Sequence, residues 1–162
     1  MAEKKMYNIG YTQGTFDLFH IGHLKLLENA QKQCRHLIVG VNSDRLVKEY
    51  KNKETNINET ERAAIVGSIK GVEGVIITDT LDKLKIQEKT GFNVIFIGDD
   101  WKGNDRWEQT KKDLAERGVD VVFLPYTKSI STTKLCKQVY EKYKINFVKK
   151  KRYKISFFKK KK

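Results

Sequence analysis

The sequence predicts an α/β fold, a single doubly wound domain built on a five-stranded parallel sheet. Short apolar runs rich in β-branched residues alternate along the chain with segments of helical periodicity. This alternation is typical of parallel strands whose two faces are covered by helices. The chain has 162 residues, 39% of them hydrophobic, which suits one domain with a core of ordinary size. Polar clusters follow four of the five predicted strands.

Each predicted strand is a short run of mainly apolar residues, many of them Val, Ile or aromatic. In chain order the strands are predicted at residues 7–13, 36–42, 74–78, 93–97 and 119–124. Helical spacing of apolar residues predicts the connecting helices at 22–33, 59–69, 81–89, 106–117 and 131–143. Segment 43–58 is polar and weakly periodic, so we predict a long loop there with a short helical turn at 44–50.

The net charge of +13 is concentrated at the C-terminus. From Lys142 onward there are eleven Lys or Arg and no acidic residue, whereas residues 1–141 carry 22 basic and 20 acidic side chains. We therefore expect a catalytic domain at 1–143 and a poorly ordered lysine- and aromatic-rich tail at 144–162. Such a tail either stays in solvent or makes weak contact with an anionic membrane. The nearly neutral body argues against a nucleic-acid partner.

The sequence lacks the features of membrane-spanning, secreted and disulfide-rich proteins. No apolar run approaches the length of a membrane span, and the first ten residues contain no apolar signal region. Cys34 and Cys136 lie a hundred residues apart without the spacing of a disulfide framework. We expect a cytoplasmic protein with free thiols.

The most informative segment is GTFDLFHIGH, Gly14 to His23, at the junction of the first strand and the first helix. The N-terminus of a helix attracts anions because its N–H groups are unpaired and carry partial positive charge. His20 and His23 are three residues apart and share a helix face, so both are expected to point at such an anion. A metal site is the alternative, but no third ligand is evident.

Three further clusters follow strand ends and are expected at the same edge of the sheet. SISTTK offers the hydroxyls of Ser131 and Thr132 at a helix start, either as helix caps or as ligands of a polyphosphate. Lys51, with Lys48 and Lys53 nearby, can close over that charge from the polar loop. In GDDWKG, Asp99 and Asp100 can bind ribose hydroxyls or approach a divalent ion, and Trp101 can stack on a base. The alternative is an acidic turn in which Trp101 only covers the core.

Taken together, GTFDLFHIGH, ERAAIV, GDDWKG and SISTTK resemble the HxGH nucleotidyltransferase superfamily, and closely the cytidylyltransferases of the bacterial glycerol-3-phosphate type. The resemblance spans residues 7–140. It implies a small Rossmann-like domain, commonly a homodimer, in which a substrate phosphate attacks the α-phosphorus of CTP and pyrophosphate leaves. Mg²⁺ is implied as the cofactor, held mainly by the triphosphate rather than by the protein.

The resemblance also implies roles for individual residues. His20, His23 and Lys51 correspond to catalytic positions, with the two histidines stabilising the α-phosphate. The implied nucleotide ligands are Gly14, Thr15, Phe16, Asp99, Trp101, Ser131 and Thr132. Asp17, Arg62 and Lys128 are assigned to the phosphate of the second substrate, with Arg62 alternatively contacting a neighbouring subunit.

One departure from the pattern concerns the second substrate. Relatives commonly read RTEGIST where this chain reads YTKSIST, so Tyr126 replaces a phosphate-binding arginine and Lys128 supplies a positive charge two residues later. The leading hypothesis is a CTP-dependent enzyme that makes a CDP-alcohol such as CDP-glycerol for a cell-surface polymer or lipid. The alternatives are ATP-dependent transfer to a sugar phosphate or flavin, and a non-catalytic nucleotide-sensing or membrane-tethering module.

Overall fold

The computed structural model describes residues 6–143, and its sheet has the predicted doubly wound order. All five strands are parallel and are arranged β3-β2-β1-β4-β5. Their bounds are β1 Tyr7–Gly14, β2 Cys34–Asn42, β3 Val72–Thr78, β4 Val94–Gly98 and β5 Asp120–Leu124. The strand order reverses at β1, which pairs with β2 on one side and β4 on the other, so a ligand site is expected at its carboxyl end.

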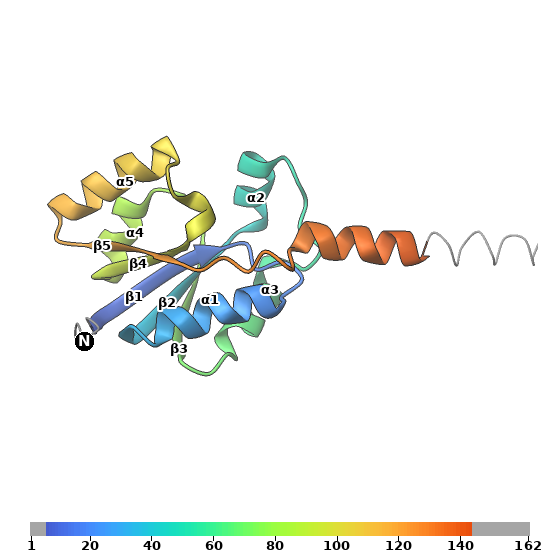
Figure 1. Cartoon of the computed structure of the whole chain (residues 1–162), viewed down its shortest axis with the longest axis horizontal. Helices are drawn as coiled ribbons and strands as arrows, with labels where there is room; N and C mark the ends of the chain where they lie inside the picture. Colours follow the sequence, from blue (N-terminus) through green and yellow to red (C-terminus); the bar gives the residue numbers. More distant parts are fainter. Residues whose placement is uncertain (1–5, 144–162) are drawn as a thin grey trace, which may run out of the picture.

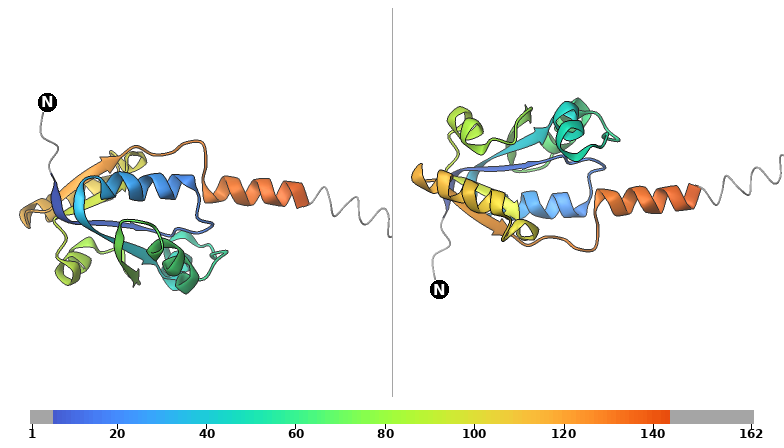
Figure 2. Two further views of the ribbon diagram at one scale, coloured as in Figure 1. Left: turned by 90° about the horizontal axis from the view of Figure 1, so that it is seen from below. Right: turned by 90° about the horizontal axis from the view of Figure 1, so that it is seen from above.

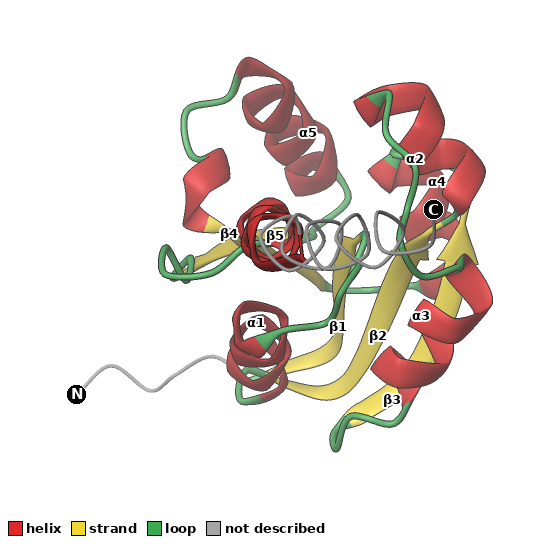
Figure 3. Cartoon of the chain, turned by 90° about the vertical axis from the view of Figure 1, so that its right-hand side faces the viewer, coloured by secondary structure: helices red, strands yellow, loops and turns green. Residues whose placement is uncertain are grey.

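The helices cover both faces of the sheet. They are α1 Ile21–Gln31, α2 Asp44–Lys51, α3 Glu59–Gly67, α4 Lys83–Thr90 and α5 Asp105–Glu116, with a short 3₁₀ turn, η1, at Asp99–Trp101. Figure 3 shows α1 and α3 on one side of the sheet and α4 and α5 on the other. The α/β class and the five-stranded sheet are therefore confirmed.

Two apolar clusters, one on each face, form the core. Leu37, Val39 and Val41 of β2 pack with Leu27 of α1 and Val66 of α3. On the other face Ile95 and Ile97 of β4 pack with Ile86 of α4 and Leu114 of α5. Alternate residues of β4 thus serve opposite faces, because successive side chains of a strand point to opposite sides.

Segment 43–58, predicted as a loop, is partly helical. The short helical turn expected at 44–50 is confirmed and extends to Lys51 as α2. Ser43 caps the helix by accepting a hydrogen bond from the backbone N–H of Leu46, and Asn52 ends it in a left-handed conformation. Strands β2 and β3 each begin two residues earlier than predicted.

A final helix at residues 132–143 leaves the body of the domain (Figure 1). The perpendicular views of Figure 2 show the same helix extending past the end of the sheet. The Thr132 hydroxyl donates to the backbone oxygen of Asp17 at 2.7 Å, which ties the start of this helix to the turn after β1. The predicted tail at 144–162 lies outside the described residues. Within residues 6–143, no helix is long and apolar enough to cross a membrane.

Candidate nucleotide-binding site

The turn between β1 and α1 is tightly wound and places His20 at the helix start. Phe16 and Leu18 have positive φ angles of 54° and 47°, a left-handed conformation that non-glycine residues seldom adopt. Such strained turns concentrate at functional sites because the surrounding structure must hold them. His20 is the N-cap of α1, and its Nδ1 accepts the backbone N–H of Gly22 at 3.1 Å.

The two histidines form a stacked pair at this helix start. Their ring centroids are 3.8 Å apart and their planes are 19° from parallel. The Nδ1 of His23 accepts the backbone N–H of His20 at 3.3 Å, so each imidazole has its Nδ1 occupied as an acceptor. The ring proton of each is therefore on Nε2, which leaves one N–H donor per ring for a ligand.

Burial keeps both imidazoles neutral. Desolvation lowers the pKa of His20 below its ordinary value. The pKa of His23 is lowered to about 3, first by desolvation and then by the neighbouring His20, while Asp17 opposes the shift. At neutral pH the pair therefore offers two neutral hydrogen-bond donors rather than two positive charges.

Lys51 reaches the same turn from the last residue of α2. Its Nζ donates to the Thr15 hydroxyl at 2.9 Å and lies 5.1 Å from the centroid of the Tyr50 ring. Sequence analysis placed this lysine on a loop, whereas the structure fixes its backbone at a helix terminus. Lys51 therefore lies beside the turn after β1, and its role over a bound phosphate stays a prediction.

A second helix start faces the first across the cleft. Ser131 caps helix 132–143 by accepting the backbone N–H of Lys134 at 3.2 Å, and Thr132 is tied to Asp17 as described above. Ser131, Thr132 and Thr133 all line the same cleft as the histidines. Two helix N-termini directed at one cleft make a favourable site for a polyphosphate.

The cleft at the carboxyl ends of the strands has a volume of about 420 Å³. Eight of the predicted site residues line it: Gly14, Thr15, His20, His23, Lys51, Trp101, Ser131 and Thr132. Five predicted residues do not: Phe16, Asp17, Arg62, Asp99 and Lys128.

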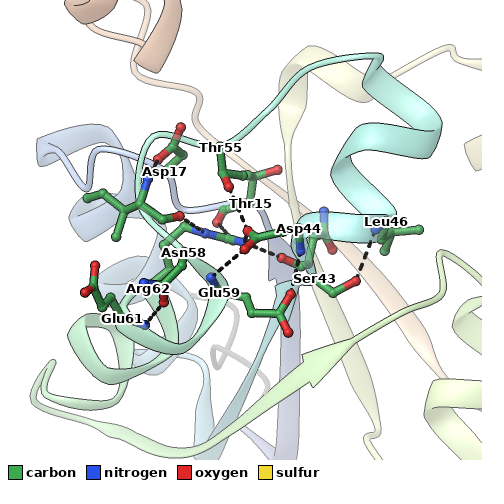
Figure 4. Close-up of polar contacts among 12 residues, drawn as sticks. Thr15, Asp17, Ser43, Asp44, Leu46, Thr55, Asn58, Glu59, Glu61 and Arg62 are labelled. Carbon is green, nitrogen blue, oxygen red and sulfur yellow. Dashed lines mark hydrogen bonds and ion pairs between the residues drawn. The ribbon is translucent and has the colours of Figure 1, made fainter.

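Arg62 is a buried structural residue in this structure rather than a contact for substrate phosphate. Its side chain is completely buried, and its guanidinium donates to the backbone oxygens of Thr15, Ile57 and Asn42 and to the Asp44 carboxylate (Figure 4). The acceptors come from the ends of β1 and β2, the start of α2 and the loop before α3. Arg62 thus holds together the segments that carry Thr15 and Lys51.

Asp17 has a similar structural role. Its carboxylate is buried and accepts the backbone N–H groups of Leu18, Asn56 and Ile57 and the side-chain amide of Asn56, at 2.8–3.1 Å. A carboxylate that already accepts four hydrogen bonds has little capacity left for a ligand. The prediction that Asp17 faces a substrate phosphate is not met here, because its acceptors are engaged with the loop after α2.

The remaining three residues lie near the cleft without lining it. Asp99 accepts the backbone N–H of Tyr126 at 3.0 Å and so joins the loops after β4 and β5. Phe16 is buried in the core beneath α1. The side chain of Lys128 is exposed, and its backbone oxygen accepts a hydrogen bond from Lys134.

Sequence analysis missed a polar network on the floor of the cleft. Lys83 donates to Gln13 Oε1 at 2.6 Å, Gln13 Nε2 donates to Asn42 Oδ1 at 2.7 Å, and Asn42 Nδ2 donates to Tyr50 Oη at 3.0 Å. Tyr50 in turn lies 3.4 Å from the Thr15 hydroxyl that Lys51 contacts. Gln13 and Asn42 are polar residues at the ends of two predicted strands. That position is the sequence feature from which they could have been predicted.

The residues of the cleft are compatible with Mg²⁺ held by a nucleotide. Within residues 6–143, no cluster of three His, Cys, Asp or Glu side chains could hold a metal, and Asp100 is the carboxylate that lines the cleft. Desolvation raises the pKa of Asp100 above its ordinary value. Because Mg²⁺ usually binds through one or two carboxylates, water and substrate phosphates, Asp100 would suffice as the protein ligand. Mg²⁺ as the cofactor stays a prediction.

Comparisons with known proteins are consistent with this geometry. The model of the cytidylyltransferase-like family matches residues 11–157, a region that ends within the predicted tail. The glycerol-3-phosphate cytidylyltransferase of Bacillus spizizenii is 37% identical over 129 residues, which cover 79% of this chain and 94% of that protein. The bifunctional protein HldE of Hyphomonas neptunium is 37% identical over 127 residues, but the match spans only 26% of that longer protein.

Solved structures show the same fold at low sequence identity. A lipopolysaccharide core biosynthesis protein from Thermoplasma volcanium superposes with a TM-score of 0.63 and 21% identity, covering 76% of this chain and 99% of that one. A pantothenate synthetase from Thermus thermophilus gives a TM-score of 0.55 and 16% identity, covering 75% of this chain and 57% of that one.

Proposed function

The chain belongs to the cytidylyltransferase-like family, and we propose that it transfers CMP from CTP to a small phosphorylated alcohol such as glycerol 3-phosphate. The products are a CDP-alcohol and pyrophosphate. The observation that carries the proposal is the stacked His20–His23 pair, which lines one cleft together with the helix start at Ser131–Thr133. A pair of neutral donors between two helix N-termini suits the α-phosphate of a bound nucleotide.

The chemistry requires positioning and charge stabilisation. An anionic oxygen of the acceptor phosphate attacks the α-phosphorus of CTP, the bond to the bridging oxygen breaks, and its electron pair leaves with pyrophosphate. No side chain needs to take a proton, because the attacking oxygen is already ionised. The histidine N–H groups stabilise negative charge on the α-phosphate, and Lys51 neutralises charge between the two substrates. When bound, Mg²⁺ neutralises part of the charge of the triphosphate.

The relatives support both the nucleotide class and an alternative. The name of the Bacillus relatives, at 35% and 37% identity over 94% of their length, favours CTP and glycerol 3-phosphate. The matches to HldE proteins have similar identity, so the relatives are not restricted to the glycerol-3-phosphate type. Transfer from ATP to a sugar phosphate or flavin, the alternative raised by the sequence, stays the second candidate. The proposed homodimer and a role in cell-surface polymer or lipid synthesis rest on the family resemblance alone.

The test is pyrophosphate release in the presence of Mg²⁺, with CTP, ATP, GTP and UTP each combined with phosphorylated alcohols, sugars and flavin mononucleotide. Turnover with CTP and an alcohol phosphate is expected. Turnover only with ATP would replace the proposal by its alternative, and failure with every pair would favour a non-catalytic nucleotide-binding module.

A pair of histidine variants makes the test specific to the site. His20→Ala is expected to lower kcat by about 100-fold or more while CTP still binds, because one preorganised donor to the transferred phosphate is lost. His36→Ala is the matched control, since His36 lies on β2 beside Glu73 and does not line the cleft. Equal effects of the two substitutions would contradict the role of His20.

A further inference from the structure

Two cationic side chains line the cleft on the side opposite the histidines. Lys83 is the first residue of α4 and Arg106 lies in the first turn of α5, whereas His20 and His23 belong to α1 on the other face of the sheet. The Lys83 ammonium lies 5.9 Å from the centroid of the Trp107 ring, which also lines the cleft. None of these three side chains takes part in the proposed transfer of CMP.

Among the residues that the structure describes, neither cation of this pair is neutralised by an ion pair. Lys83 is only 7% exposed, and its hydrogen-bond acceptors, Gln13 Oε1 and the backbone oxygen of Leu81, are both neutral. Burial and then the nearby Arg106 lower the pKa of Lys83 to about 7, while the negative charge of Asp82 opposes the shift.

A buried ammonium without a counter-charge is costly, and a second cation beside it raises the cost. A buried lysine that lines a substrate cleft and has no ion-pair partner is suited to an anionic ligand, because the ligand would supply the missing counter-charge. Gln13 links Lys83 through Asn42 and Tyr50 to the Thr15 hydroxyl that Lys51 contacts. Because Lys51 is proposed to lie between the two substrates, we assign this neighbouring subsite to the acceptor.

We propose that Lys83 and Arg106, with Trp107 as a wall, bind a second anionic group of the acceptor, such as a carboxylate or a second phosphate. This inference rests on the proposed function and specifies its acceptor. The reacting phosphate lies near Lys51 and the histidines, and the second anion occupies the α4–α5 side of the cleft. Glycerol 3-phosphate has only neutral hydroxyls to offer there, so it is a poorer acceptor than an otherwise similar molecule with an additional negative charge.

The decisive experiment compares glycerol 3-phosphate with 3-phosphoglycerate, which carries a carboxylate in place of the terminal hydroxymethyl group. Pyrophosphate release with CTP is measured for both acceptors. We expect kcat/KM to be at least tenfold higher for 3-phosphoglycerate, because a charge-assisted contact is added without changing the reacting phosphate. Equal rates, or a preference for glycerol 3-phosphate, would overturn the inference and leave the proposed function intact. No pyrophosphate with either acceptor or any other would remove both.

Variants of Arg106 and Lys83 test whether these residues cause the preference for 3-phosphoglycerate. Arg106→Gln is expected to lower kcat/KM about tenfold for 3-phosphoglycerate and less than threefold for glycerol 3-phosphate; Arg106 is exposed, so this variant should fold. Lys83→Gln is expected to act in the same direction, with folding checked by its thermal transition. Lys112→Gln removes a charge from the exposed side of α5 and is expected to change neither value. If Arg106→Gln lowers both values equally, the arginine binds the common phosphate and the proposal is wrong.

Discussion

At the scale of single residues, the site depends on the neutral state of the stacked histidines. The pKa of His23 is about 3 in the folded chain, against about 6.5 in an unfolded one. The unfolded state therefore binds a proton first as the pH falls, so the stability contributed by the neutral ring is complete above about pH 6.5 and declines progressively below it. The lowered pKa of His20 acts in the same direction.

We predict that this dependence is measurable between pH 7 and pH 5. The free energy of unfolding from urea titration should fall by about 1–2 kcal/mol more in the native chain than in His23→Asn. Asn is chosen because its Oδ1 can replace Nδ1 as acceptor of the His20 backbone N–H. The same slope in both proteins would show that the protonation of His23 does not limit stability.

Gly22 leaves room for the imidazole ring of His20. A Cβ at this position would lie 2.9 Å from Cε1 and 3.0 Å from Nδ1 of His20, too close for the ring to stay in place. Gly22→Ala should therefore lower kcat by about tenfold or more, since a displaced donor loses its alignment with the α-phosphate. Alanine favours a helix by about 1 kcal/mol over glycine, so the thermal transition should change little.

The matched control for Gly22→Ala is Gly67→Ala at the end of α3. A Cβ there meets its nearest neighbour, Cγ2 of Val75, at 3.5 Å, an ordinary contact. Activity should be unchanged in this variant. A large loss of stability in Gly22→Ala, rather than of kcat, would count against the steric argument.

Sequence patterns located the residues whose positions follow from strand ends and helix starts. His20, His23, Ser131 and Thr132 were found because a glycine turn or a hydroxyl cluster marks each helix start. Lys83 and Arg106 were missed because a lysine or arginine at a helix start has no distinctive pattern. Lys83 is distinguished by its burial and by its contact with Gln13, 70 residues away, and Arg106 by its place in the lining of the same cleft.

At the scale of secondary structure elements, Arg62 explains how α2 and its loop are held. Arg62→Lys should lower the free energy of unfolding by about 2–4 kcal/mol, because an ammonium cannot serve the four acceptors that the guanidinium reaches and buried carbonyls lose their donors. The measurement is equilibrium urea denaturation. Activity should fall together with stability, since the segments bearing Thr15 and Lys51 lose a common anchor.

A surface arginine provides the comparison for Arg62. Arg45 is exposed and pairs with Glu49 and Asp79, so Arg45→Lys should change stability by less than about 0.5 kcal/mol. If Arg62→Lys were as stable as Arg45→Lys and only raised the KM of the acceptor, the sequence-based assignment of Arg62 to substrate phosphate would be reinstated.

Helices and strands could be predicted from the sequence where their apolar residues recur at a regular spacing. The five strands and the doubly wound arrangement of the sheet were predicted from β-branched runs that alternate with helical segments. Helix α2 was predicted only as a short turn because Leu46 and Val47 are its only buried residues. Its stability comes from the Ser43 cap and from the contact of Asp44 with Arg62, which lies 18 residues away in sequence.

At the scale of the whole molecule, the positive charge is divided between the cleft and the C-terminal segment. Within residues 6–143, the cleft is lined by Lys51, Lys83 and Arg106 and by the carboxylate of Asp100. Residues 144–162 carry ten Lys or Arg and no acidic residue, and without them the net charge would fall from +13 to +3. Attraction to anionic surfaces should therefore depend on the segment and catalysis on the cleft.

We predict that deleting residues 144–162 separates the two properties. Sedimentation with vesicles rich in anionic phospholipid should show binding of the full chain and its loss in the truncated one, because each lysine near such a surface contributes about 1 kcal/mol. The kcat for pyrophosphate release should stay within about twofold, since the histidines, Lys51 and the helix start at Ser131–Thr133, which line the cleft, all precede the deletion. Neutral vesicles and raised ionic strength are the controls for charge. Equal sedimentation of both chains would show that the segment is only a solvated end, and a collapse of kcat on truncation would show that it contributes to the catalytic domain.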